Sequence, residues 1–229
     1  MDFEPIKTDR LYVKVADKVS TLITSGKIKP GERLPSERDL AERLQVSRPT
    51  IREAMIALEL SGIIEIRTGS GIYVTEKKPS LKINDKGVGP FEILESRAMI
   101  EVDACGLAAT RINDEQIAQL RDALEEMKEE QISENPSEQA DWKFHCIIAE
   151  ATQNSAIYSI VNWLWELRNQ SALSTSYLER IRKEGVRPAI EDHKKIIDAL
   201  EKRDPVAAKK AMRQHIKRAT AATAAHFET

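Results

Sequence analysis

The sequence is poor in cysteine and in aromatic residues, and it has no long apolar run. Its two cysteines, Cys105 and Cys146, each lie in an apolar pattern of helical period, so a reducing compartment is expected and a disulfide framework is not. No apolar run approaches the roughly 18 residues that a membrane-spanning helix requires. The acidic start MDFEPIKTDR does not resemble a signal peptide. These absences predict a cytoplasmic protein.

A large excess of charge of either sign is also missing. The 229 residues contain 35 Lys and Arg against 37 Asp and Glu, which argues against a protein that coats nucleic acid with its whole surface. The charge is unevenly distributed, however, because residues 1–78 carry 14 basic and 12 acidic side chains. Any nucleic-acid site should therefore be local and lie in the first third of the chain.

The character of the sequence changes once. Residues 76–90 are rich in Lys, Gly and Pro and lack an apolar period, which is typical of a linker. Mixed helix and strand signals precede this segment, and helical signals follow it to the end. We therefore expect a domain over residues 1–75, a linker over 76–90 and a second domain over 91–229.

The first domain begins with three predicted helices. The apolar period predicts a helix over 10–26 that stops at a glycine. Ser36 is a typical cap for a short second helix over 37–45. Ser47 is a typical cap for a third helix, in which Pro49 occupies the first turn, where its missing N–H costs nothing.

A β-hairpin is expected to follow the third helix, which should end near Ser61-Gly62. Ile64-x-Ile66 and Ile72-x-Val74 alternate on either side of a glycine-containing turn. Helix, short helix, turn, helix and hairpin together predict a winged helix-turn-helix.

The second domain is predicted to be all-α. About six helices are expected, most of them joined by short connections, which favours an antiparallel bundle. Their ranges are 91–111, 114–130, 137–152, a long helix from about residue 155, 189–203 and 205–227. The whole chain is thus predicted to be mainly α.

The start of the third helix carries side chains suited to DNA. In a helix-turn-helix this end enters the major groove, where Arg48 and Arg52, one turn apart, can each offer two donors to guanine. Ser47 and Thr50 can donate to phosphates or bases. The alternative is that the arginines only solvate a helix end, but the cap, the short preceding helix and the wing together favour DNA.

The apolar side of the same helix should pack on the domain core. We expect it to consist of Ile51, Met55, Leu58 and Leu60.

Three of the four histidines predict a metal site in the helical domain. Asp141 and His145 are four residues apart and share a helix face. His193 and His215 each lie 11 residues from a turn centred near Asp204, so they should face each other at the same height of an antiparallel pair. Such a set suits a divalent metal, with zinc the first choice and nickel or manganese the alternatives. The alternatives remain that the histidines are hydrogen-bonded core residues or that His193 caps its helix.

A family resemblance adds to the DNA-binding hypothesis. The pattern PGERLPSERDLA…VSRPTIREA…GSGIYV within residues 29–74 resembles the DNA-binding domain of the GntR family of bacterial transcription regulators. The resemblance implies a homodimer that reads a palindromic operator in double-stranded DNA. It also implies DNA contacts at Arg38, Ser47, Arg48, Pro49, Thr50, Arg52 and Gly69.

The helical domain resembles the ligand-sensing domain called FCD, found in the FadR branch of that family. Metal-dependent members match Asp141, His145, His193 and His215 one for one, and their sites leave positions open to water or to an effector carboxylate. Arg97 matches a family arginine that can pair with this carboxylate, although an ion pair with Glu101 is an alternative use for it. The segments 89–101, 151–161 and 203–215 look most like regulators of hexuronate catabolism.

These expectations combine into a metabolite-responsive repressor rather than an enzyme. A small carboxylic acid, a hexuronate on the resemblance, would bind at the metal and at Arg97 and alter DNA affinity. Release from DNA is the habit of the family. Two alternatives remain open: a DNA-binding regulator whose metal is structural and whose helical domain only dimerises, and a metalloenzyme with a DNA-binding appendage.

Overall fold

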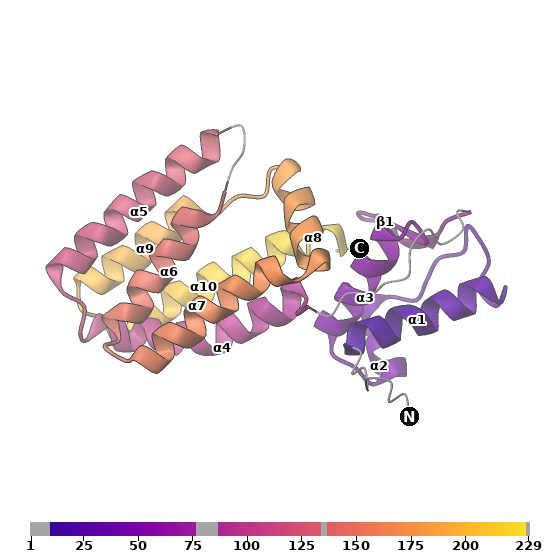
Figure 1. Ribbon diagram of the computed structural model, residues 1–229, viewed down its shortest axis with the longest axis horizontal. Coiled ribbons are helices and arrows are strands. Elements are labelled where there is room, and N and C mark those ends of the chain that lie inside the picture. Colours follow the sequence, from indigo (N-terminus) through magenta and orange to yellow (C-terminus); the bar gives the residue numbers. More distant parts are fainter. Residues whose placement is uncertain (1–9, 77–86, 134–136, 228–229) are drawn as a thin grey trace, which may run out of the picture. The chain divides into compact units, whose positions relative to one another are not determined.

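The computed structural model describes residues 10–76, 87–133 and 137–227, so most of the predicted linker 76–90 lies outside the described residues. The chain divides into two units (Figure 1). Unit 1 comprises residues 1–92, 170–177 and 224–229, and unit 2 comprises residues 93–169 and 178–223. Among the described residues, every helix is too short or too polar to cross a membrane.

Unit 1 contains a winged helix-turn-helix, as predicted. Helix α1 packs on α3, and α2 packs on α3 as well. The two strands pair antiparallel, with Ile64 opposite Val74 and Arg67 opposite Gly71. The bounds are α1 Leu11–Thr24, α2 Glu37–Leu44, α3 Arg48–Leu60, β1 Ile64–Arg67 and β2 Gly71–Val74.

Local side-chain chemistry sets where these helices begin. The Ser36 hydroxyl accepts the backbone N–H of Asp39 at 3.2 Å, and the Ser47 hydroxyl accepts the backbone N–H of Thr50 at 3.2 Å. Each serine therefore satisfies one of the free N–H groups of a helix start. Both predicted caps are confirmed.

The buried side of α3 differs from the prediction at one position. Ile51, Met55 and Leu58 are completely buried, whereas Leu60 is 42% exposed. The spacing explains the difference, because two residues on a helix correspond to a rotation of about 200° and Leu60 therefore leaves the face of Leu58.

The helical part of the chain differs from the prediction between residues 155 and 183. Two helices, α7 and α8, stand where one long helix was expected, and they are separated at Ser171. The Ser171 hydroxyl accepts the backbone N–H of Ser174 at 3.1 Å, so this serine caps the start of a new helix. The bounds of the helices after the wing, of which η1 and the first half of α8 belong to unit 1, are α4 Pro90–Ala109, α5 Asp114–Ile132, α6 Gln139–Ala151, α7 Ser155–Gln170, α8 Ala172–Lys183, α9 Ile190–Glu201, α10 Pro205–Thr223 and the 3₁₀ turn η1 Ala225–Phe227.

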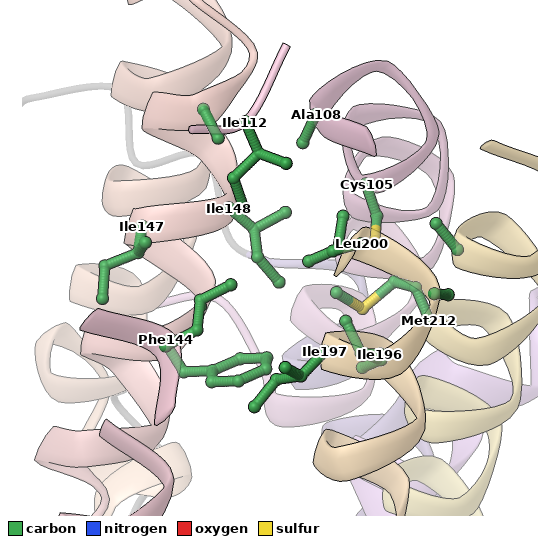
Figure 2. Packing of buried hydrophobic residues seen from close by; sticks show 14 of the residues in the cluster. Cys105, Ala108, Ile112, Phe144, Ile147, Ile148, Ile196, Ile197, Leu200 and Met212 are labelled. Atoms are coloured by element: carbon green, nitrogen blue, oxygen red, sulfur yellow. The ribbon is translucent and has the colours of Figure 1, made fainter. Parts of the chain in front are cut away.

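The core of unit 2 lies among α4, α5, α6, α9 and α10. Helix α5 packs on α6 and on α9, and α9 packs on α10. Phe144 of α6 points toward Ile196 and Ile197 of α9, beside Met212 of α10 (Figure 2). Because residues of the predicted metal site neighbour these core side chains in sequence, the packing of the core also positions that site.

Candidate metal centre and nucleic-acid interface

The two arginines of the recognition helix are held by one carboxylate. Arg48 Nε lies 2.6 Å from Glu37 Oε1, and Arg52 Nε lies 2.7 Å from Glu37 Oε2. Glu37 is the first residue of α2, and the two arginines are in the first turns of α3. The turn between the helices therefore brings an acid onto the predicted DNA-reading side chains.

The other predicted contacts of this interface differ in exposure. Arg38 and Ser47 are exposed and Pro49 is half-buried. Thr50 is only 2% exposed, and its hydroxyl lies 2.8 Å from that of Ser47, so the two hydroxyls form one hydrogen-bonded pair at the start of α3.

The wing requires glycine at its turn. Gly69 has a φ of +73° and Gly71 a φ of +120°, which are values that side chains rarely tolerate. A Cβ at Gly71 would also lie 2.4 Å from Arg33 Nε, because the Arg33 side chain runs across this position. Gly69 has open space around it, so its backbone is accessible at the tip of the wing.

The four predicted metal ligands come together in unit 2. Asp141 and His145 come from α6, His193 from α9 and His215 from α10. One potential ligand atom of each residue lies within 4.8 Å of all the others, and all four residues are buried. The rings of His193 and His215 are 4.4 Å apart between centroids, as expected from their equal distance from the turn.

Hydrogen bonds orient the ligand atoms. His193 Nδ1 lies 3.0 Å from the Ala189 carbonyl, so its N–H can donate there and leave the Nε2 lone pair facing the cluster. His193 Nε2 lies 2.9 Å and His145 Nε2 3.5 Å from the same oxygen, Asp141 Oδ1. The alternative that His193 caps its helix is wrong, because no side chain of the described residues caps the start of α9.

Arg97 and Glu101 of α4 adjoin the cluster. Arg97 Nε donates to Glu101 Oε1 at 2.7 Å, and Arg97 Nη2 lies 3.2 Å from His145 Nε2. Glu101 Oε2 lies 2.6 Å from His145 Nδ1. The Arg97 guanidinium also lies over the ring of Trp165, 4.1 Å from its centroid. The predicted Arg97–Glu101 pair thus forms beside the predicted metal ligands.

The ionisation of Asp141 and His215 suits a bound cation, whereas that of His145 does not. Burial lowers the pKa of His145, but the nearby Glu101 outweighs burial and raises this pKa. Burial raises the pKa of the Asp141 carboxyl, but hydrogen bonds from His145 and His193 outweigh it and lower this pKa well below its usual range. Burial, together with the nearby His193 and His145, lowers the pKa of His215 well below its usual value. An ionised carboxylate and a neutral imidazole are the forms that bind metal.

The donor set also fits a divalent metal. Three imidazoles and one carboxylate are ligands that zinc accepts, and nickel or manganese accepts them too. His215 Nδ1 is a buried nitrogen without a hydrogen-bond partner among the described residues, which is costly unless something binds it. The residues present therefore could hold such an ion.

Three side chains at these sites were not predicted as functional. Glu37 holds the recognition arginines, Trp165 packs on Arg97, and Arg33 lies across Gly71 in the groove that Arg38, Arg48 and Arg52 also line. Arg33 and Glu37 belong to the highly charged segment GERLPSERD, which was the available signal. Trp165 carries no signal in the sequence beyond its apolar helical position.

Known proteins of similar sequence extend along most of this chain. The Uxu operon transcriptional regulator of Escherichia coli (strain K12) is 37% identical over 220 residues, covering 90% of this chain and 84% of that protein. The Exu regulon transcriptional regulator of the same strain is 36% identical over 213 residues, covering 90% and 82%. A solved structure described as Streptococcus agalactiae GntR is 28% identical, covers 91% of this chain and 98% of that one, and has a TM-score of 0.47.

Two family models match separate parts of the chain. Residues 11–74 match the bacterial regulatory proteins of the gntR family, and residues 92–218 match the FCD domain. The first match spans the helix-turn-helix and its wing, and the second spans Arg97 and the four residues of the cluster. The chain therefore belongs to the GntR family, whose members bind DNA as transcriptional regulators and are not enzymes, and it carries an FCD domain for a small-molecule effector.

Proposed function

We propose that the protein is a cytoplasmic repressor that a small carboxylic acid releases from its operator. The acid would bind at a metal ion held by Asp141, His145, His193 and His215. The observation that carries this proposal is the position of Arg97, whose Nη2 lies 3.2 Å from a nitrogen of His145 while its Nε is fixed by Glu101. A cation and a guanidinium side by side can together bind one carboxylate.

The guanidinium of Arg97 is well prepared for this role. Glu101 and Trp165 fix its orientation, and Arg97 Nη1 makes no hydrogen bond within the described part of the chain. A guanidinium whose orientation is already fixed, and whose Nη1 group is available, loses less side-chain entropy on binding a carboxylate than a flexible guanidinium does. The predicted ion pair with Glu101 therefore supports effector binding rather than replacing it.

Zinc is the metal we propose, and nickel and manganese remain the alternatives. The set of three histidines and one aspartate suits all three ions, so availability in the cell would decide. When bound, the ion would supply an electrophilic site for an effector oxygen. The chain's own residues hold the ligands in place and exclude water from them.

Hexuronates are the effectors we propose. Three segments, 89–101, 151–161 and 203–215, resemble regulators of hexuronate catabolism. The names of the two Escherichia coli relatives place those proteins at the Uxu operon and the Exu regulon. A sugar acid also has the chemistry that the site requires, namely one carboxylate and several hydroxyl groups.

On the DNA side, we propose a homodimer on a palindromic operator, since two-fold symmetric half-sites match the symmetry of a dimer. The exposed Arg38 and Arg48 would contact bases or phosphates directly. Thr50 would act through its hydrogen-bonded pair with Ser47, since it is almost completely buried. The proposed contacts are Arg38, Ser47, Arg48, Pro49, Thr50, Arg52 and Gly69.

A second candidate has one observation in its favour. The four ligands are all buried and come from three helices, which is also the arrangement of a structural metal site. In that case the metal would stabilise the bundle, and no effector would be needed. Binding of an acid at the metal separates the two candidates.

A thermal-shift screen tests the proposal. Zinc-loaded protein is heated with D-glucuronate, D-galacturonate or D-glucose, and again after treatment with a chelator. We expect a hexuronate to raise the Tm by about 2–5 °C, because a ligand that binds only the folded state stabilises it. Glucose has no carboxylate and should leave the Tm unchanged, and chelation should abolish the shift.

Two matched arginine variants sharpen this screen. Arg97→Lys keeps the charge beside Glu101 but loses the two-armed guanidinium, so the hexuronate shift should disappear. Arg121→Lys makes the same change at an exposed ion pair on α5 and should keep it. If no acid changes the Tm of the metal-loaded protein, the sensing role is wrong and the structural-metal candidate remains.

A further inference from the structure

Glu37 contacts both arginines at the start of the recognition helix α3. Its two carboxylate oxygens accept from two different arginines, Oε1 from Arg48 Nε at 2.6 Å and Oε2 from Arg52 Nε at 2.7 Å. The side chain of Glu37 is 11% exposed, whereas that of Arg48 is 61% exposed. A single acid of α2 thus contacts both arginines at the start of α3, and the Arg52 guanidinium also lies over the ring of Phe91, 5.1 Å from its centroid.

We propose that Glu37 is a positioning residue for base recognition, which orients Arg48 and Arg52 before DNA arrives. This inference rests on the proposed DNA contacts of the two arginines. Glu37 itself would not contact a base, and its effect on DNA would pass through the two guanidinium groups.

The contacts with Glu37 leave the terminal nitrogens of both arginines available for bases. Both contacts use Nε, and neither arginine makes another hydrogen bond within residues 10–76, 87–133 and 137–227. The terminal Nη1 and Nη2 atoms are the pair that reaches guanine O6 and N7 end-on. A carboxylate on Nε therefore restrains the plane of the guanidinium without occupying those two atoms.

Stability is not a sufficient reason for this arrangement. The ion pair between Glu37 and Arg48 contributes little to folding, because the Arg48 side chain is 61% exposed and water screens the pair. The pair with Arg52, which is 17% exposed, does contribute to the fold, but it does not require that the same carboxylate also contact Arg48. Arginine has many rotamers, however, and ordering them on DNA reduces affinity for every sequence. Ordering them in the free protein removes part of that loss and penalises sequences whose guanines do not match the fixed positions.

The charge around Glu37 also favours a role in specificity. Arg33, Arg38, Arg48 and Arg52 line a groove of about 460 Å³ with Glu37 as its acidic member. An acid in a basic groove weakens attraction to phosphates, which is the part of DNA binding that does not depend on sequence. A surface built only for affinity would gain from a neutral residue at position 37.

Three variants test the proposal in the full-length protein. Glu37→Gln keeps the shape but offers one acceptor oxygen and turns an NH₂ donor toward an arginine. Glu37→Asp keeps the charge at the start of α2 but is one methylene shorter, so it cannot span both arginines. Glu42→Gln is the matched control, because it removes an exposed charge from the same helix.

The probe is a DNA duplex selected from a random library with the wild-type protein, and a scrambled duplex of equal length is its reference. Fluorescence anisotropy at several salt concentrations gives the ratio of the two affinities. We expect Glu37→Gln to lower this ratio about ten- to hundredfold, which is the discrimination of about one arginine–guanine pair. Glu37→Asp should lie between Glu37→Gln and wild type, and Glu42→Gln should match wild type.

Other outcomes overturn the proposal. If Glu37→Gln binds both duplexes more tightly by the same factor, and with a steeper salt dependence, Glu37 only neutralises part of the arginine charge and does not position the arginines. If Glu37→Asp equals wild type, charge alone matters and positioning is wrong. If the ratio is unchanged while the Tm falls, Glu37 serves only the fold of the helix-turn-helix.

The arginines themselves separate this inference from the proposed function. If Arg48→Ala and Arg52→Ala both leave the affinity ratio unchanged, the proposed DNA contacts are wrong. If each of them lowers the ratio, the decisive measurement is Glu37→Gln in the Arg48→Ala/Arg52→Ala background. Positioning requires that Glu37→Gln has no further effect on the ratio there, and a further loss contradicts it.

Discussion

Glu101 contacts two predicted functional residues at once. One oxygen accepts from Arg97, and the other lies 2.6 Å from His145 Nδ1. Burial raises the pKa of the Glu101 carboxyl, but the nearby Arg97 and His145 outweigh it and lower this pKa to about 2. The carboxylate is therefore charged and buried, and it links the proposed effector arginine to a proposed metal ligand.

We predict that Glu101→Gln weakens metal binding and destabilises the metal-free protein. Loss of a partner behind a metal-binding histidine lowers metal affinity by about 10- to 100-fold. Leaving the buried charge of Arg97 without a counter-charge lowers the free energy of unfolding by about 3–5 kcal/mol. Competition with a colorimetric zinc chelator measures the first effect, and urea unfolding of chelated protein measures the second.

Glu95→Gln provides the matched control for this variant. It makes the same change on the same helix at an exposed side chain, so both measurements should equal those of wild type. Wild-type zinc affinity and stability in Glu101→Gln would show that the Glu101 contacts contribute nothing to the site.

Individual elements begin and end where side chains satisfy the backbone. Helix α5 has a complete capping box, in which the Asn113 side chain accepts the Gln116 N–H at 2.8 Å and the Gln116 side chain accepts the Asn113 N–H at 3.2 Å. Serine at 171 has a similar effect by starting α8. A cap inside a continuous helical pattern can thus divide one predicted helix into two.

We predict that Asn113→Ala lowers the free energy of unfolding by about 0.5–2 kcal/mol, because an N–H at the start of α5 loses its partner. Gln116→Ala should destabilise by less, and the double variant should be less destabilised than the sum of the two, since both bonds belong to one motif. Urea unfolding of the three proteins is the measurement.

Gln119→Ala serves as the control, because this glutamine lies inside α5 and outside the cap. Equal destabilisation by Gln119→Ala and Gln116→Ala would mean that the capping box contributes nothing beyond helix propensity. Strict additivity in the double variant would mean that the two hydrogen bonds form independently.

At the scale of the whole molecule, regulation requires that effector and DNA favour different states. An effector changes DNA affinity only as far as it binds those states differently. Linkage between two binding events is reciprocal, so the factor by which the effector changes DNA affinity equals the factor by which DNA changes effector affinity.

We predict that a hexuronate weakens operator binding by about 5- to 150-fold and that operator DNA weakens hexuronate binding by the same factor. Anisotropy titrations with and without the acid give the first factor, and calorimetry with and without DNA gives the second. His193→Ala loses a proposed metal ligand and should lose both effects together. Coupling that persists in this variant would remove the metal from the mechanism.

Much of this architecture could be predicted from local patterns. The caps at Ser36 and Ser47, the glycine turn of the wing and the helical periods are properties of neighbouring residues, and the structure has them where they were expected. The facing of His193 and His215 was also predictable, because an antiparallel pair places residues at equal distances from the turn opposite each other.

What the sequence by itself determined, then, is the type and order of the elements and the residue types of the two candidate sites. Tertiary structure decided that Glu37 holds Arg48 and Arg52 and that Glu101 links Arg97 to His145. The physical reason is rotation, since a helix turns about 100° per residue and a pattern sets its buried face only approximately. Which polar side chains meet across two elements depends on that rotation, and only packing of the whole core fixes it.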